Sequence, residues 1–312
     1  MTVILEAERV WVHYGRVAAV RGVSLTLHAG ELMGLIGPNG AGKTSLFRGL
    51  AGLQPLTAGR VRVLEQDVLP GRHETLGRIG FAPDTPPVYE TLTVAQFLEF
   101  IGRGYGLSAT MIEERTGFWL DQLWLAEKRL DRIATLSRGM RQRLTIARTL
   151  LADPPFILLD EPSAGLDPAG RVRFRQLLTS LREQGKALIV SSHILADLHE
   201  YCTHIGIIET GAIRQFGTVA EVVTGQASDR CRYRATLARP IPEAAIVLKS
   251  LDGLTQISVE GRVISFEYLD DPVRASDLLG EMIRHGLPVA SFSPIALNLE
   301  EAYLRAGIKQ VD

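Results

Sequence analysis

Two stretches near the amino terminus alternate apolar and polar residues. Residues 3–12 and 17–28 follow a two-residue period and are rich in valine, a pattern typical of half-buried strands. Tyr14 and Gly15 lie between the two stretches. We therefore predict two strands, joined by a short turn, at the start of the chain.

Farther along, several short runs are apolar throughout, which predicts fully buried strands. These runs are residues 32–36, 156–159 and 187–190. Helical patterns separate these runs. One helix is predicted to begin near residue 43, and residues 91–152 are predicted to be helical with turns at 102–106 and near 131. Further helices are predicted over 168–184 and from about residue 194. A predicted hairpin of residues 205–208 and 212–216 follows. Strands that alternate with helices favour an α/β fold with a largely parallel sheet.

The composition changes near residues 225–228, and a second pattern begins there. It predicts strand, helix, strand, strand, helix and strand over 231–237, 242–250, 254–259, 262–268, 272–285 and 287–293, followed by a last helix. This order is typical of a ferredoxin-like α+β domain. Because 312 residues exceed what one core normally needs, we predict a large domain over 1–225 and a small one over 226–312.

Composition and charge narrow the class of protein. The net charge of −1 gives no electrostatic reason to expect nucleic acid or an anionic membrane surface as the partner. The first residues lack the basic start and long apolar stretch of a signal peptide, and no run approaches the roughly 18 apolar residues of a membrane helix. Cys202 and Cys231 have no metal-ligand spacing, so we expect reduced thiols in a reducing compartment.

One stretch fits the phosphate-binding pattern G-x-x-x-x-G-K-[ST] at every position. It consists of Gly37, Pro38, Asn39, Gly40, Ala41, Gly42, Lys43 and Thr44, and Ser45 follows it. The stretch lies between a predicted strand and a predicted helix, where glycines let backbone N–H groups surround phosphates. Lys43 is expected to reach the β- and γ-phosphates, and Thr44 to offer its hydroxyl to Mg²⁺. The alternative is a glycine-rich turn with an incidental lysine.

Two carboxylates follow the apolar run 156–159 directly. In an α/β sheet the carboxyl end of such a strand lies beside the phosphate loop. Asp160 is expected to hold Mg²⁺, directly or through water. Glu161 is then placed to orient and deprotonate the water that attacks the γ-phosphate. The alternative is a solvated acidic strand end without a role.

Between these two motifs lies Leu136–Arg143, which reads LSRGMRQR. This stretch resembles the signature of the ABC ATPases, which reads LSGGQ or, in one large branch, a variant such as LSRGM. The resemblance covers about residues 3–220 and implies a P-loop NTPase core with a mixed sheet, an antiparallel β subdomain and a helical subdomain over about 85–152. In the family, the residues matching Ser137 and Gly139 meet the γ-phosphate held by the other protomer, at a helix N-terminus that suits an anion.

Three further positions match the family one by one. Tyr14 matches the aromatic residue that stacks on adenine, although a structural hairpin tyrosine is the alternative. Residues 163–167 match the loop that couples the two sites of a dimer, which makes Asp167 a nucleotide-site candidate; the alternative is a simple turn into a helix that begins at Pro168. His193 matches the histidine that contacts the γ-phosphate, although a lone histidine is more often structural.

Asp84 departs from the family pattern. It stands where the family usually has a glutamine that meets Mg²⁺ and senses the membrane partner. Asp84 is therefore a candidate metal ligand, but its shorter side chain leaves direct contact, contact through water and a purely structural role open. An acidic residue at this position is found in the same exporter branch that uses LSRGM.

The end of the chain supports the same branch. Residues 297–304 read LNLEEAYL and resemble the SLEDVFL ending of ABC-2-type exporter ATPases. The resemblance implies ATP and Mg²⁺ as ligands, ATP hydrolysis, and a peripheral location at the cytoplasmic face of the plasma membrane. It implies as partners a membrane-spanning permease and a second copy of the chain or a related ATPase. Whether the tail serves dimer contact, regulation or packing stays open.

Two rival functions remain to be weighed. ABC ATPases that act on DNA or ribosomes usually carry two cassettes, a long inserted coiled coil or a zinc module, none of which this sequence has. We expect its arginine cluster to be a solvated helix face with structural pairing rather than a nucleic-acid patch: Arg129, Arg132, Arg138, Arg141, Arg143 and Arg148. A binding module that does not hydrolyse ATP is disfavoured by Glu161 and His193.

Overall fold

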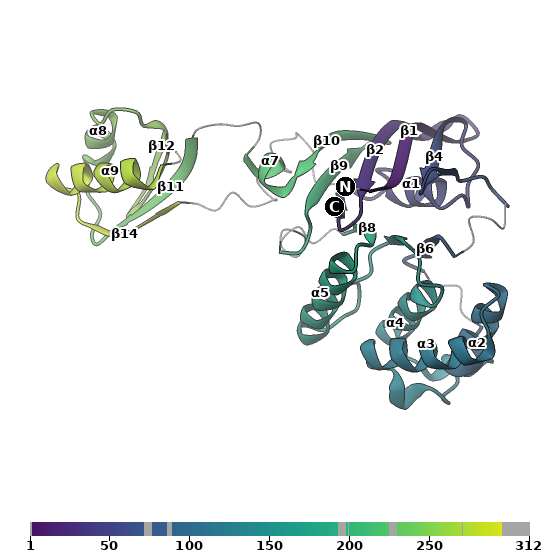
Figure 1. Cartoon of the computed structure of the whole chain (residues 1–312). Helices are drawn as coiled ribbons and strands as arrows, with labels where there is room; N and C mark the ends of the chain where they lie inside the picture. Colours follow the sequence, from purple (N-terminus) through teal and green to yellow (C-terminus); the bar gives the residue numbers. More distant parts are fainter. Residues whose placement is uncertain are drawn as a thin grey trace. The chain divides into compact units, whose positions relative to one another are not determined.

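Figure 1 shows the computed structural model of the chain, coloured from the amino to the carboxyl terminus. The structure describes residues 2–71, 77–85, 89–192, 198, 200–224, 230–269 and 271–294. The chain divides near residue 219 into two compact units, which are described separately below. The helix predicted from about residue 194, His193 and the tail 297–304 lie outside the described residues.

The centre of the first unit is a six-stranded sheet with the order β10-β9-β3-β8-β7-β6. Its strands from β9 to β6 are parallel, and β10 is antiparallel to β9. The strands are β3 (Leu32–Ile36), β6 (Ile79–Ala82), β7 (Phe156–Leu159), β8 (Ala187–Ser191), β9 (His204–Glu209) and β10 (Ala212–Thr218). Every residue of β3, β7 and β8 is buried, which explains their unbroken apolar sequences.

A second, antiparallel sheet has the order β2-β1-β4-β5. It contains β1 (Val3–Tyr14), β2 (Val17–His28), β4 (Ala58–Val63) and β5 (Gln66–Asp67). Its apolar side chains share one core with β3 and with α1 (Lys43–Leu50), the helix that follows the phosphate loop. The prediction of β1 and β2 is confirmed, and the sheet as a whole supplies the antiparallel β subdomain.

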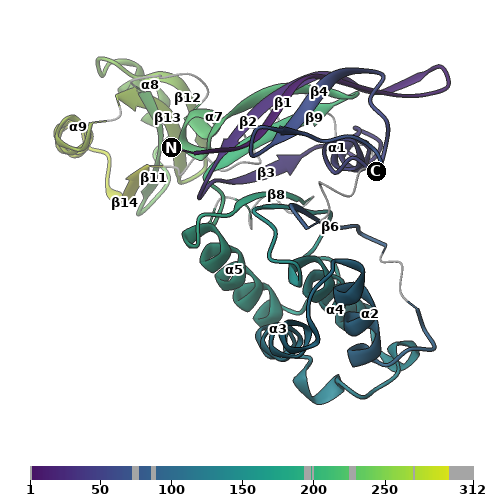
Figure 2. The ribbon, with the colours of Figure 1, turned by 45° about the vertical axis from the view of Figure 1, so that its right-hand side comes forward.

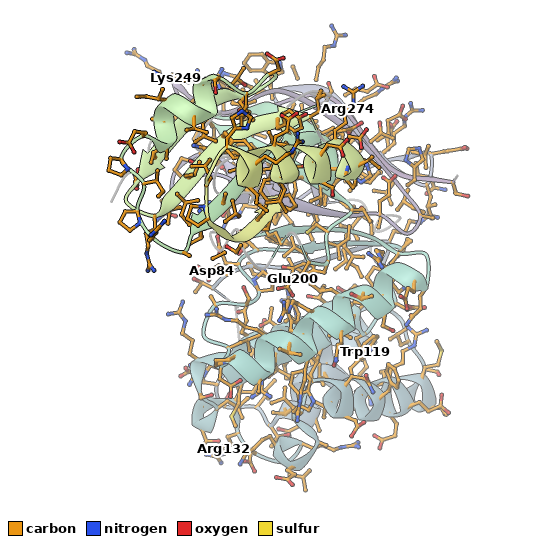
Figure 3. The ribbon with its side chains drawn as sticks, turned by 90° about the vertical axis from the view of Figure 1, so that its left-hand side faces the viewer. Asp84, Trp119, Arg132, Glu200, Lys249 and Arg274 are labelled. Carbon is orange, nitrogen blue, oxygen red and sulfur yellow. The ribbon has the colours of Figure 1, made fainter. Side chains whose placement is uncertain are left out.

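A group of helices forms the third part of this unit. It contains α2 (Val94–Gly104), α3 (Ala109–Gln122), α4 (Arg138–Leu150) and two short 3-10 turns, Ala126–Lys128 and Ile133–Thr135. Figure 2 shows α2, α3 and α4 side by side below the sheets, and α5 (Pro168–Glu183) running from below β8 down to α3. Figure 3 labels buried Trp119 inside this group and exposed Arg132 at its lower end. The predicted helical subdomain is confirmed.

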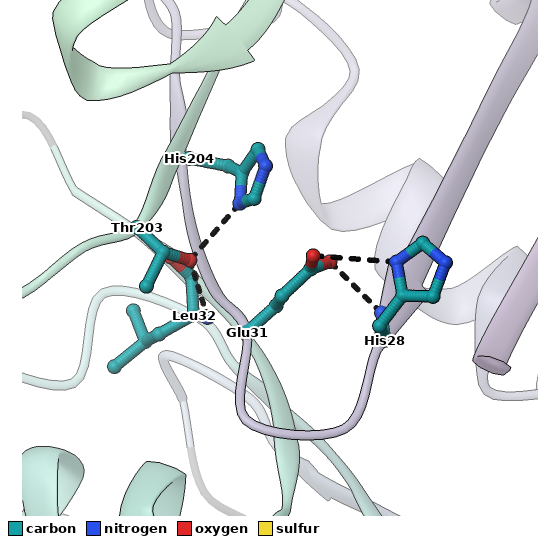
Figure 4. A network of polar contacts seen from close by, with 5 residues as sticks. All are labelled: His28, Glu31, Leu32, Thr203 and His204. Atoms are coloured by element: carbon teal, nitrogen blue, oxygen red, sulfur yellow. Dashed lines mark hydrogen bonds and ion pairs between the residues drawn. The ribbon is translucent and has the colours of Figure 1, made fainter. Parts of the chain in front are cut away.

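A polar network fixes the start of β3, the strand that leads to the phosphate loop (Figure 4). The backbone N–H of Leu32 donates to Thr203 Oγ1 at 2.9 Å, and this hydroxyl donates back to the Leu32 carbonyl at 3.0 Å. Beside it, Glu31 accepts a 2.8 Å hydrogen bond from the His28 backbone N–H. These bonds join the end of β2 and the starts of β3 and β9. They lie at the end of the sheet opposite to the phosphate loop and help to hold these strands in register.

The second unit is an antiparallel sheet with the order β12-β13-β11-β14 and two helices. It contains β11 (Arg230–Leu237), α8 (Ala244–Lys249), β12 (Thr255–Glu260), β13 (Val263–Leu269), α9 (Pro272–Arg284) and β14 (Val289–Pro294), and α7 (Val219–Thr224) precedes it. Residues of both helices and of the sheet form a core of its own around Phe266. The predicted ferredoxin-like order is confirmed. Within the described ranges, no helix is both long and apolar enough to cross a membrane.

Candidate functional site

The phosphate loop joins β3 to α1 and depends on two crowded glycines. Gly42 has φ of 105°, and a Cβ there would collide with the carbonyl oxygen of Ala19 in β2. A Cβ on Gly37 would collide with the carbonyl oxygen of Ile208 in β9. The loop is therefore clamped between β2 and β9, and only residues without a Cβ fit at these two positions.

Lys43 opens α1, and its ammonium group lies inside the loop. Its Nζ donates to the carbonyl of Gly37 at 2.6 Å and to that of Pro38 at 3.3 Å. Burial lowers the pKa of Lys43, and the nearby carboxylates of Glu161 and Asp160 oppose this shift. The side chain is a preorganised cation at the point where phosphates would enter the loop.

Asp160 and Glu161 follow β7, as the sequence predicted, and Ser191 holds both. Thr44 Oγ1 donates to one Asp160 oxygen at 2.6 Å, and Ser191 Oγ donates to the other at 2.7 Å. The backbone N–H of Glu161 donates to the same Ser191 hydroxyl at 2.8 Å. Glu161 has φ of 47°, an uncommon conformation for a residue with a side chain, and such strain tends to collect at functional sites.

A cleft of about 480 Å³ gathers most of the predicted phosphate-site residues. It is lined by Pro38, Asn39, Gly40, Ala41, Gly42, Lys43, Thr44, Ser45, Asp84, Asp160 and Glu161. It is also lined by residues that the motifs did not indicate, namely Val17, Ala18, Ala19, Arg21, Thr210 and Gly211. These come from β2 and from the β9–β10 turn, where the Arg21 N–H donates to the Gly211 carbonyl at 2.7 Å. No sequence motif marks these residues, and their place at the site follows only from the packing of β2 and the β9–β10 turn against the phosphate loop.

Ser137 and Gly139 lie at the start of α4. The Ser137 hydroxyl caps the helix by accepting from the backbone N–H of Met140 at 3.3 Å. Ser137 is exposed, and a Cβ on Gly139 would lie 2.9 Å from the Gly165 carbonyl oxygen. Among the described residues around the phosphate cleft, neither Ser137 nor Gly139 contributes to its lining. The start of α4, which carries the signature, thus lies outside the lining of the chain's own phosphate cleft.

Asp167 and Tyr14 also lie outside the lining of the cleft, as far as the described residues show. Asp167 caps α5, since its Oδ1 accepts from the backbone N–H of Gly170 at 2.7 Å. Tyr14 ends β1, pairs with Val17 across the hairpin and is 42% exposed. Both side chains are accessible at the surface of the unit. The structure leaves their predicted roles as predictions.

The arginines around α4 make contacts with the protein itself. Arg129 pairs with Glu113 at 2.5 Å. Arg148 donates to the carbonyl of Phe81 at 2.9 Å, and burial lowers its pKa. These contacts agree with the structural pairing expected for the cluster.

Comparisons with known proteins show which family the chain resembles. The model of the ABC transporter family matches residues 20–164. An ABC transporter ATP-binding protein from Synechocystis sp. is 37% identical over 67% of this chain, which spans only 59% of that protein's length. Nod factor export ATP-binding protein I from Ralstonia nicotianae is 30% identical over 97% of this chain and 94% of its own length. A solved ATP-binding subunit of an ABC transporter has a TM-score of 0.67 and 28% identity, covering 71% of this chain and 92% of that one.

The chain belongs to the ABC transporter ATP-binding proteins. It is accordingly an ATPase and the ATP-binding subunit of a transporter. The resemblance to the exporter-type branch that LSRGM indicated is supported by relatives whose names include export.

Proposed function

We propose that this chain powers export by closing as a dimer on two ATP molecules. The observation that carries the proposal is the separation of two half-sites. The phosphate loop and carboxylates line one cleft, whereas the exposed N-terminus of α4, with Ser137 and Gly139, lies outside that lining. A helix N-terminus attracts an anion such as a γ-phosphate. A second copy, or a related ATPase, would bring its own Ser137 position to the phosphate bound here.

The predicted site residues each have a proposed task. Lys43 neutralises the β- and γ-phosphates, and the backbone N–H groups of the loop hold their oxygens. Glu161 orients the attacking water and takes its proton, with its backbone fixed by Ser191. Tyr14 stacks on adenine, Asp167 couples the two sites, and His193 contacts the γ-phosphate; these three roles rest on the family resemblance.

The residues present fit Mg²⁺, the metal that the family implies. Thr44 Oγ1 and an Asp160 oxygen lie 2.6 Å apart at the mouth of the loop, and hydroxyl and carboxylate oxygens are the ligands that Mg²⁺ prefers. Among the described residues, no group of three or more His, Cys, Asp or Glu could hold a metal ion. Bound Mg²⁺ would neutralise charge on the β- and γ-phosphates. Asp84 lines the same cleft and remains a candidate ligand.

The partner proposed for this subunit is a membrane-spanning permease that holds it at the cytoplasmic face of the plasma membrane. A groove of about 1030 Å³ lies between the sheets and the helical group. Its lining includes exposed Leu53 and Phe100 together with Pro83 and Thr85, the neighbours of Asp84. Because Asp84 itself lines the phosphate cleft, an apolar permease segment in the groove would touch a loop that also borders the nucleotide site.

The experiment that tests the proposal is the change Glu161→Gln in the full chain. We expect ATP hydrolysis to fall by about 10²- to 10⁴-fold, because the proton acceptor is lost while the phosphate loop is intact. ATP binding should persist, and ATP should convert the protein to a species of twice the mass in light scattering. A Glu161→Gln protein that binds ATP and stays monomeric at high concentration contradicts the dimer mechanism. Co-purification with nucleic acid instead of a membrane protein contradicts the transport role.

A further inference from the structure

Trp124 occupies an unusual backbone position at the end of α3. Its φ is 54°, in the left-handed region. The turn is closed by the Leu125 N–H, which donates to the Leu120 carbonyl at 2.7 Å. Glycine or asparagine is the usual residue where a helix ends in this way, and a bulky side chain there carries a conformational cost. A tryptophan occupies this position in spite of that cost.

Two arginines from different helices approach the Trp124 ring. The guanidinium of Arg143, on α4, lies 5.8 Å from the ring centroid, and that of Arg173, on α5, lies 5.3 Å from it. Both distances are within the range of cation–π attraction. A single ring thus contacts the two helices whose first turns carry the signature and the coupling loop.

Arg143 extends the cluster to those first turns. Its guanidinium donates to the Leu123 carbonyl at 3.1 Å and to the Trp124 carbonyl at 3.3 Å, and its Nε donates to the Gly139 carbonyl at 3.4 Å. Asp167, the cap of α5, acts electrostatically on the same guanidinium. The signature glycine, the α3 turn and the cap of α5 are therefore connected through one side chain.

The first turn of α4 also lies against the loop that precedes α5, which makes the relative position of the two helices sensitive. A Cβ on Gly139 would lie 2.9 Å from the Gly165 carbonyl, so the backbones are already in close contact. A small rotation of α4 against α5 would change how Ser137 and Asp167 face a second copy together. Binding-site groups need to be held within a fraction of an ångström for full activity.

We propose that Trp124 is a positioning residue, which with Arg143 and Arg173 locks the first turns of α4 and α5 into one rigid face for the second copy. The proposal rests on the dimer mechanism above. It assigns no contact with nucleotide to Trp124, which acts through the two arginines.

Two substitutions separate positioning from folding. Trp124→Gly removes the ring but relieves the left-handed backbone, so the melting temperature should change little. We expect kcat for ATP hydrolysis to fall about tenfold, the size of effect that two modest cation–π contacts can supply, while ATP affinity of the monomer is retained. Trp124→Phe keeps a weaker aromatic face and should recover part of the lost rate. Gln176→Ala, an exposed change on α5, is the control.

A double-mutant cycle with Arg173→Met provides the second measurement, since methionine keeps an apolar stem without the charge. The effects of Trp124→Gly and Arg173→Met on kcat should be clearly less than additive. The proposal is overturned if Trp124→Gly leaves kcat and ATP-induced dimer formation in the Glu161→Gln background as in the parent. It is also overturned if the two changes add fully. If the Glu161→Gln parent itself does not dimerise with ATP, the dimer mechanism fails instead.

Discussion

At the scale of single residues, burying the charged ammonium of Lys43 lowers the free energy of unfolding, and the size of this effect depends on pH. Its pKa in the folded protein is lowered by burial below the ordinary value of 10.5, so between these two values the unfolded chain binds more protons. The folded state therefore gains stability as the pH rises through this window. We expect the wild type to become more stable relative to Lys43→Met when the pH is raised from 7 to about 9.5.

Urea denaturation without nucleotide at the two pH values measures this difference. Lys249→Met, at an exposed lysine of the second unit, is the control. If the free energy of unfolding of Lys43→Met instead rises relative to that of the wild type at high pH, the lowered pKa of Lys43 is contradicted. Lys43→Met should also lose the stabilisation that ATP gives the wild type.

The glycines of the phosphate loop make a second prediction at this scale. Gly42→Ala should prevent the native loop, because its Cβ would collide with the Ala19 carbonyl, and ATP binding should be lost. Gly40 also has positive φ, at 79°, but a Cβ there meets nothing within 4 Å. Gly40→Ala should therefore cost only the backbone strain of about 1–2 kcal/mol. Thermal unfolding compares the two, and equal losses would show that the crowding at Gly42 is unimportant.

Much of the site was predictable at the residue scale because the phosphate loop has a fixed spacing that its chemistry demands. The motif gave Lys43, Thr44 and the glycines, and the apolar run before Asp160 gave the carboxylates. Ser191, which holds Asp160 and Glu161, was not predicted, since a single serine at the end of a strand carries no spacing signal. Arg21 was missed for the same reason.

At the scale of elements, Asp167 has a structural task that can be separated from its predicted coupling role. It caps α5 through Gly170, and removing such a cap typically costs about 1 kcal/mol. Asp167→Ala should lose about this amount of stability, whereas Asp167→Asn keeps an acceptor oxygen and should melt close to the wild type. If coupling needs the charge, both variants lose it in an ATPase assay. Equal melting temperatures for all three proteins would contradict the capping role.

Helices and strands were predictable from the sequence where burial alone determines the pattern of residues. Strands β3, β7 and β8 are buried on both faces, so apolarity alone marks them. Strands β4 and β5 were not predicted, because β4 alternates valine with Arg60 and Arg62, whose partners Glu8 and Glu6 lie far away in the sequence, on β1. Such a strand is recognised only when its partner is known.

At the scale of the whole molecule, the groove between sheets and helices makes the partner testable. Phe100 lines the groove and is 55% exposed, whereas Phe118 is 54% exposed on α3 and lies outside the lining as the described residues give it. Phe100→Asp should abolish co-purification with the proposed permease, because a charge would enter an apolar contact. Phe118→Asp is the matched control. Equal loss for both variants, or for neither, would place the permease elsewhere.

The loop that carries Asp84 belongs to two cavities at once, since Asp84 borders the phosphate cleft while Pro83 and Thr85 border the groove. Thermodynamic linkage makes such sharing reciprocal. If bound nucleotide raises the affinity of this chain for a permease by some factor, the permease must raise its affinity for nucleotide by the same factor. Residues 83–85 would in this way let a permease that has bound its substrate change the affinity of this subunit for ATP.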